Sequence, residues 1–264
     1  FLAAYVNNRI KELNYKIFKP LAVRFIDITH FEGYRVYQRT ISFVMQMAVA
    51  ELFPERKLHI RHTLGSGFYC EFSDGNRPTA EQLDSLQRRM QSIVDMDLPI
   101  TRRKCLAEEA RFEYEKFGLT DRLELINTRP HLYRTVSYLG DMPGYFYGTL
   151  APSTRYVSLF SLTPYYNGFY VALPERGNPL KLTPSVELDK MFDIFHEYQM
   201  WIDIMGVPTV GDLNRRVMEG DASELIKIAE AFHENKIASI ARSIATANKE
   251  RGVRMALISG PSSS

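Results

Sequence analysis

The end of the sequence matches the start of a phosphate-binding loop. An apolar stretch, Val253–Ile258, is followed closely by Gly260, Pro261, Ser262, Ser263 and Ser264. In the pattern G-x-x-x-x-G-K-[ST], backbone amides hold phosphate oxygens and the lysine neutralises the outer phosphates. The sequence stops before the Gly-Lys-Ser/Thr that would complete this pattern. We interpret residues 253–264 as a buried first strand and a truncated ATP-binding loop, with a flexible serine-rich tail as the alternative.

A second candidate for chemistry is the pair His59 and His62, with Cys70 nearby in the sequence. Imidazole and thiolate groups are the ligands that zinc prefers. On a strand, however, residues three apart point to opposite faces of the sheet, so the two histidines are not expected to share an ion. The sequence therefore predicts no metal site here.

Aromatic residues are concentrated in the middle of the chain. Such side chains can stack on nucleic-acid bases, but alternating aromatics also stabilise ordinary sheets. Packing within sheets is the favoured interpretation, and base stacking is the alternative. The residues concerned are Tyr138, Tyr145, Phe146, Tyr147, Tyr156, Tyr165, Tyr166, Phe169 and Tyr170.

Hydrophobic spacing predicts the elements that must position these residues. Apolar residues at helical intervals indicate an amphipathic helix over residues 39–53. Thr79, with Gln82 three residues later, forms a capping box and predicts the start of another helix. Asn167-Gly168, which lies between aromatic pairs, predicts a β-hairpin with a type I′ turn.

The pattern becomes helical from about Thr183. Apolar residues recur at helical spacing from Leu188 to Met205, and Asp221 with Glu224 forms another capping pair. The helical pattern continues to about Arg251. We therefore predict an all-α connector over residues 183–252.

The composition is that of an ordinary globular protein. Hydrophobic residues make up 45% of the chain, enough for a buried core, and the net charge of +2 implies no broad attraction to nucleic acid or membrane. No apolar run approaches the roughly 20 residues that span a bilayer. Cys70 and Cys105 are the only cysteines, and the sequence shows no secretory leader. These features predict a reducing, cytoplasmic location.

Residues 38–118 resemble the editing domain of threonyl-tRNA synthetases, and residues 1–33 resemble the second half of the TGS domain that precedes it there. The matching stretches are Glu51-Leu52-Phe53-Pro54, the hairpin Leu64–Phe72, the helix from Thr79 to Met90, Glu108-Glu109-Ala110-Arg111 and Phe117-Gly118. The resemblance implies an α+β fold. An editing-domain-like α/β sandwich over residues 34–182 would follow a partial TGS-like β unit, and the helical module would come after it.

The same resemblance implies a site that has lost its ligands. In that family an H-x-x-x-H pair and a C-x-x-x-H pair build a metal-like polar site, and the equivalent positions here are Arg39, Phe43, Phe146 and Leu150. Phenylalanine and leucine bind no zinc, and arginine stays protonated. We therefore expect no catalytic residue and no metal. The expected remnant is a vestigial pocket lined by Arg39, Phe43, Tyr69 and Phe146, where Arg39 would attract a phosphate or carboxylate.

The end of the sequence also resembles the start of the nucleotide-binding loop in bacterial uridine kinases. One bacterial family joins a TGS domain, a degenerate editing domain, a helical connector and a uridine-kinase-like domain, and this sequence resembles the part before the kinase core. The leading hypothesis is a non-catalytic regulatory, docking or oligomerising region of an ATP-dependent nucleoside kinase. That resemblance implies no cofactor within the chain, but ATP, Mg²⁺ and a pyrimidine nucleoside for a full-length protein.

Two alternatives come from different classes. One is a tRNA- or nucleotide-binding module that has kept affinity after losing hydrolysis, which would bind in a salt-dependent manner. The other is an active editing hydrolase, which the missing ligands disfavour. Self-association into a homo-oligomer is a further expectation, whereas binding to a membrane is not expected.

Overall fold

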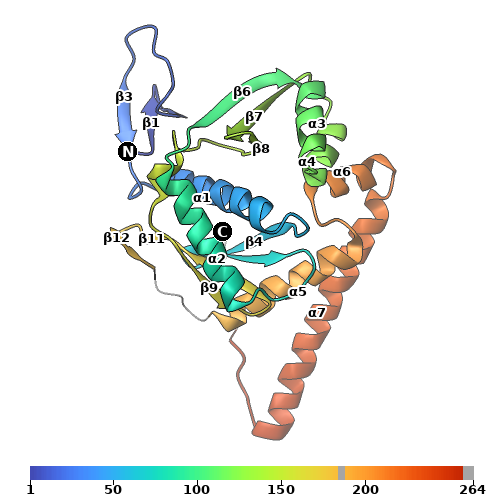
Figure 1. The fold of residues 1–264 in the computed structure, drawn as a ribbon. Coiled ribbons are helices and arrows are strands. Elements are labelled where there is room, and N and C mark those ends of the chain that lie inside the picture. The colour runs from blue at the N-terminus through green and yellow to red at the C-terminus, as the bar shows by residue number, and fades with distance from the viewer. Residues whose placement is uncertain (184–187, 258–264) are drawn as a thin grey trace. The chain divides into compact units, whose positions relative to one another are not determined.

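The computed structural model describes residues 1–183 and 188–257, which form the predicted α+β fold (Figure 1). The chain divides into two compact units, Phe1–Phe195 and His196–Ser264. Every strand that the structure describes belongs to the first unit.

The first unit opens with a small antiparallel sheet in the order β2-β1-β3. Its strands are β1 (Ala3–Val6), β2 (Arg9–Lys11) and β3 (Val23–Ile26). Leu2, Ala3 and Ile26 are buried and join the main hydrophobic core. The small sheet is therefore packed against the rest of the unit through one face.

A four-stranded antiparallel sheet in the order β4-β5-β10-β9 forms the centre of the unit. Its strands are β4 (Leu58–Leu64), β5 (Gly67–Phe72), β9 (Ser161–Tyr165) and β10 (Gly168–Ala172). The helices α1 (Phe31–Leu52) and α2 (Ala80–Asp95) pack together in the same core as the inner face of this sheet (Figure 1). Phe68, Cys70 and Phe72 point from β5 into that core.

The helix α1 begins well before the predicted start at residue 39. The His30 ring nitrogen accepts a hydrogen bond from the Glu32 amide over 3.1 Å and caps the helix at Phe31. The additional turns bury Tyr34 and Val36. In contrast, the capping box of Thr79 and Gln82 that was predicted for α2 is confirmed.

A second sheet in the order β6-β7-β8 carries its own small core. The elements are β6 (Ile100–Leu106), α3 (Ala107–Lys116), α4 (Thr120–Asn127), β7 (Tyr133–Leu139) and β8 (Met142–Gly144). Cys105 and Val136 on the sheet pack with Tyr114 of α3 and Ile126 of α4. A short 3-10 helix, η1 (Thr154–Val157), and the ribbon β11 (Pro174–Glu175) and β12 (Asn178–Leu182) complete the strands and connections.

The predicted hairpin is present, but its turn lies one residue earlier than expected. Tyr165 pairs with Gly168, so the two residues of the turn are Tyr166 and Asn167, and Gly168 belongs to the strand. A Cβ atom on Gly168 would lie 2.0 Å from the Cys70 carbonyl oxygen. Glycine is required there by the close approach of β5, a requirement that does not depend on the turn.

A β-bulge in β4 corrects the prediction that His59 and His62 face opposite ways. The strand register shifts between Ile60 and His62, so His59 lies opposite Glu71 and His62 lies opposite Tyr69. Because the bulge adds one residue, both histidines lie on the outer face of the sheet. Even so, among residues 1–183 and 188–257 no group of three or more His, Cys, Asp or Glu side chains is arranged to hold a metal ion.

The boundary between the units falls within the helix α5 (Asp189–Met205), whereas the sequence pattern changes near Thr183. The start of α5 packs on the outer face of the central sheet. Phe192 stacks on Tyr166 with ring centroids 3.8 Å apart, and Phe195 stacks on His62 at 4.4 Å. These contacts join the first turns of α5 to the first unit.

The second unit, within its described residues, is helical. It contains the rest of α5, α6 (Val210–Met218) and α7 (Ala222–Arg251), and Trp201 stacks on Phe232 at 5.4 Å. Residues 253–257 are irregular and exposed, not the buried strand that was predicted. A strand needs a partner strand for its backbone groups, and the described part of this unit offers only helices. None of the described helices combines the length and apolarity needed to cross a membrane.

Candidate functional site

Three of the four residues predicted to line the vestigial pocket come together in the structure. The rings of Phe43 on α1 and Phe146 lie 4.8 Å apart, and Arg39 donates from Nε to the Thr149 carbonyl oxygen over 2.9 Å. Phe43 is fully buried, and Leu150 is 1% exposed. The four positions that the resemblance predicts to be former ligand positions thus hold packed apolar side chains and one arginine.

Tyr69, the fourth predicted residue, does not line this site. Its neighbours Phe68 and Cys70 point into the core, so Tyr69 points from the opposite face of the sheet. There its hydroxyl donates to Glu71 over 3.1 Å, and burial with the nearby Glu71 carboxylate raises the tyrosine pKa. The prediction failed because sequence proximity to the hairpin does not indicate which face of a strand a side chain occupies.

Two arginines hold the loop Phe146–Thr149 from both ends. Arg39 binds the Thr149 carbonyl, and Arg102 on β6 donates from Nη2 to the Phe146 carbonyl over 3.1 Å. Gly148 has φ +132°, and a Cβ atom there would lie 2.8 Å from Arg39 Cζ. Glycine is therefore needed both for the backbone conformation and for the close packing of the guanidinium.

Unpartnered polar atoms lie beside this loop. Ser137 is opposite Arg102 on one side and Gly144 on the other in the β6-β7-β8 register. The Ser137 hydroxyl is fully buried, and within the described part of the chain neither it nor Arg102 Nε has a hydrogen-bond partner. Buried polar groups without partners are rare because their desolvation is costly. We refer to Arg39, Arg102, Ser137 and the loop Phe146–Thr149 as the arginine site.

Positive charge at the arginine site is only partly neutralised. Arg102 forms an ion pair with Glu12 over 3.0 Å, whereas Arg39 forms none with a carboxylate among the described residues. Burial, and then repulsion by the nearby Arg35 and Arg102, lowers the pKa of Arg39, and Glu32 opposes this shift. A group with this environment gains free energy when an anion approaches.

Sequence reasoning missed Arg102 and Ser137. Arg102 lies in the basic run Arg102-Arg103-Lys104, whose alternation along β6 places Arg103 on the other face of the sheet. The sequence predicts a β-like segment over residues 98–104, which implies that alternation but does not indicate which face borders the loop Phe146–Thr149. The pairing of Ser137 with Arg102 is set by the register of β7, which no local pattern specifies.

The aromatic residues singled out in the sequence differ in burial. Phe169 and Tyr170 are buried in sheet packing, whereas Tyr147 at the tip of the clamped loop is 92% exposed. The predicted ATP-binding residues Gly260, Pro261, Ser262, Ser263 and Ser264 lie outside the described residues.

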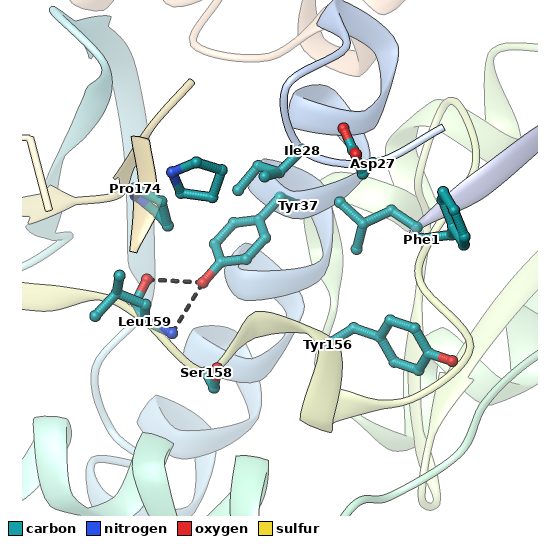
Figure 2. A pocket seen from close by; sticks show the side chains of 10 residues that line it. Phe1, Asp27, Ile28, Tyr37, Tyr156, Ser158, Leu159 and Pro174 are labelled. Atoms are coloured by element: carbon teal, nitrogen blue, oxygen red, sulfur yellow. Dashed lines mark hydrogen bonds between the residues drawn. The ribbon is translucent and has the colours of Figure 1, made fainter. Parts of the chain in front are cut away.

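A separate cavity of about 230 Å³ lies where the small sheet meets the main core (Figure 2). The Tyr37 hydroxyl there donates to the Leu159 carbonyl over 2.7 Å and accepts from the Leu159 amide over 3.0 Å. The remaining lining is mostly apolar, with Ile28, Tyr156 and Pro174 around it. The polar groups of Tyr37 are thus already used within the protein, and this cavity offers less chemistry than the arginine site.

Comparisons with known proteins show that the chain is similar in part to threonine–tRNA ligases. No family model matches the chain. The threonine–tRNA ligase of Symbiobacterium thermophilum is 30% identical over 162 residues, which is 61% of this chain and 25% of that protein. For Carboxydothermus hydrogenoformans the identity is 30% over 178 residues, covering 67% of this chain and 27% of the relative. For Coxiella burnetii it is 28% over 163 residues, covering 61% and 25%.

The chain therefore spans about a quarter of the length of the curated relatives it matches. This similarity supports the synthetase part of the resemblance, and it agrees with an editing-domain-like α/β fold followed by a helical module. None of these three relatives is a uridine kinase.

Proposed function

We propose that the first unit is a tRNA- or nucleotide-binding module, derived from the editing region of a synthetase, that binds without hydrolysing its ligand. The observation that supports this proposal most strongly is the environment of the Arg39 side chain. Its guanidinium replaces a ligand-type residue of the resembled family, is fixed to the Thr149 carbonyl, and pairs with no carboxylate among the described residues. A fixed cation that lacks an acidic partner suits a phosphate group.

The loss of hydrolysis follows from the side chains that fill the former site. Phe43 and Phe146 offer neither lone pairs for a metal nor a group that moves a proton. Their ring contact and the burial of Leu150 also exclude water from the place where a hydrolytic water would act. Binding therefore remains as the chemistry that the arginine site supports.

The other polar groups of the site fit the same ligand class. Arg102 supplies a second guanidinium, whose charge Glu12 neutralises in part. Tyr147 belongs to the loop that both arginines hold, and its exposed ring is one on which a base can stack. Groups suited to a phosphate and to a base thus come from one small region of the first unit.

Titration of the 264-residue protein with fluorescently labelled tRNA, and separately with ATP and UMP, tests this proposal. Arg39→Gln is expected to weaken binding by about tenfold to a hundredfold, as loss of a charged hydrogen bond does. Arg39→Lys tests the fork geometry, and Arg88→Gln on α2 is the matched control, because Arg88 forms only an exposed pair with Asp84. Absence of binding to both tRNA and nucleotides by the unaltered protein would refute the proposal.

A hydrolysis assay separates this function from an active editing enzyme. With seryl-tRNA and added zinc, we expect the release of serine to stay at the rate of the buffer alone. Accelerated release that is lost in Arg39→Gln would instead support catalysis at this site.

A second hypothesis is the nucleoside-kinase region predicted from the sequence. It is favoured by residues 253–264 alone, where an apolar stretch precedes Gly260 and three serines. This hypothesis includes four further predictions. They are the division of the chain at residues 33, 182 and 252, the use of ATP and Mg²⁺ by a longer protein, self-association, and a cytoplasmic location. Sequencing of the gene past Ser264 tests this hypothesis: codons for Gly-Lys-Ser/Thr support it, and any others exclude it.

A further inference from the structure

We propose that the N-terminal part of α1 forms a binding track for a single-stranded RNA segment, consisting of Phe31, Arg35, Arg39 and Arg176. This inference rests on the proposed function, because Arg39 belongs to both sites. It goes further by naming the form of the ligand and the surface over which it runs.

The track is built from one face of a helix and one turn of a hairpin. Phe31, Arg35 and Arg39 are spaced four residues apart, so they follow one another along the same side of α1 over roughly 12 Å. Arg176 comes from the turn between β11 and β12, and its guanidinium lies over the phenyl ring of Phe31. All four residues belong to the first unit.

The ring of Phe31 has two cations near it and remains accessible. The guanidinium carbons of Arg35 and Arg176 lie 5.5 Å and 5.8 Å from its centroid, near the outer limit of a cation–π contact. Phe31 is 55% exposed, although it is a large apolar residue at the start of a helix. A base can therefore take the place of one guanidinium at little cost, and the displaced cation remains close enough to bind the adjacent phosphate.

The charges along the track favour a phosphate chain. Three arginines line it. Glu32 interacts with Arg35 at a loose 3.7 Å, and Glu175, which precedes Arg176, pairs with Lys181 at 3.3 Å. Alternation of an aromatic ring with cations is the arrangement that binds single strands, because bases stack on the ring while the cations follow the backbone. A duplex keeps its bases stacked internally and would leave Phe31 without a role. Single-stranded RNA is therefore the ligand that uses every residue of the track.

Fluorescence anisotropy with the whole protein and a labelled RNA of about ten nucleotides without secondary structure tests the track. The double variant Arg35→Gln/Arg176→Gln is expected to bind at least tenfold more weakly. The slope of the logarithm of its RNA-binding constant against the logarithm of the salt concentration should also be shallower by about 1.4, which is about 0.7 for each lost phosphate contact. Phe31→Leu should weaken binding about fivefold or more, whereas Phe31→Tyr keeps the ring and should bind as the unaltered protein does.

Arg88→Gln again serves as the control, and equal thermal melting of all variants excludes misfolding as the cause of lost affinity. If the track variants bind RNA like the unaltered protein while Arg39→Gln does not, the track is wrong and the proposed function stands. Binding of a mononucleotide but of no RNA would likewise overturn the track and leave the proposed function standing. If the protein binds neither, both proposals fail.

Discussion

The Arg39 Nε–H group donates a hydrogen bond of 2.9 Å to the carbonyl oxygen of Thr149, a residue 110 positions away in the sequence. This bond connects the helix α1 to a loop that follows the β6-β7-β8 sheet. It restrains the guanidinium plane through Nε, and no hydrogen bond from the outer nitrogens is formed with the described residues. One side chain thus both stabilises the loop and supplies the charge on which the proposed function rests.

Substitution of Arg39 by methionine should lower the free energy of unfolding by about 1–3 kcal/mol, because the Thr149 carbonyl loses a charged donor while the apolar stem is retained. Urea denaturation followed by circular dichroism measures this change. Arg88→Met on the exposed side of α2 should change stability by less than about 0.5 kcal/mol. Equal effects of the two substitutions would show that the Thr149 contact contributes nothing.

The packing that replaced the former ligands should be important for stability. Phe43→Ala is expected to cost about 3–5 kcal/mol, because the side chain is fully buried and its removal leaves a cavity beside Phe146. Phe43→Leu should cost clearly less. Chemical denaturation of the three proteins provides the comparison. A loss below about 1 kcal/mol for Phe43→Ala would mean that the site is loosely packed.

His62 should make the protein less stable in acid. Burial between Phe195 and Tyr69 lowers its pKa below the ordinary 6.5, with the Glu71 carboxylate opposing the shift and Arg61 adding to it. The unfolded chain then binds the proton more readily than the folded chain. The free energy of unfolding therefore falls as the pH drops below 6.5, and it stops falling once the pH is below the lower pKa of His62 in the folded protein.

Thermal melting of the unaltered protein and of His62→Gln at about pH 7.5 and pH 5.5 checks this prediction. The decrease in Tm on acidification should be smaller in His62→Gln, which cannot be protonated. An identical decrease in both proteins would assign the acid sensitivity to other groups.

The single tryptophan allows the second unit to be followed separately. Trp201 stacks on Phe232 with an interplanar angle of 12°, and both lie in that unit. Phe232→Ala should shift Trp201 emission to longer wavelength and lower the midpoint seen by fluorescence. The main transition seen by circular dichroism in the aromatic region, where the first unit supplies most tyrosines, should move less. Equal shifts in both signals would indicate that the two units unfold together.

Tyr147 should matter for binding and not for folding. Its side chain is 92% exposed, so Tyr147→Ala should alter stability by less than about 0.5 kcal/mol. If its ring stacks on a base, the same substitution should weaken nucleotide binding about fivefold or more, and Tyr147→Phe should not. A stability loss as large as that of Phe43→Ala would instead identify Tyr147 as a packing residue.

Local patterns predicted the elements whose signals are contained within a few residues. Thr79 and Gln82 cap α2 as expected, because a capping box involves neighbouring backbone groups only. The start of α1 was predicted too late, since His30 is not among the usual capping residues. The bulge that brings His59 and His62 to one face has no local signal, because it depends on pairing with β5.

By itself, the sequence determined the identity and spacing of Arg39, Phe43, Phe146 and Leu150, and the resemblance predicts that they stand where that family has its ligands. Only the tertiary structure decided that the Phe43 and Phe146 rings are in contact and that Arg39 binds the loop Phe146–Thr149. It also decided that Tyr69 faces away and that Arg102 and Ser137 join the site. Contacts between distant residues depend on strand register and on how sheets pack against helices. Those features arise from the whole core, so they are absent from any short stretch of sequence.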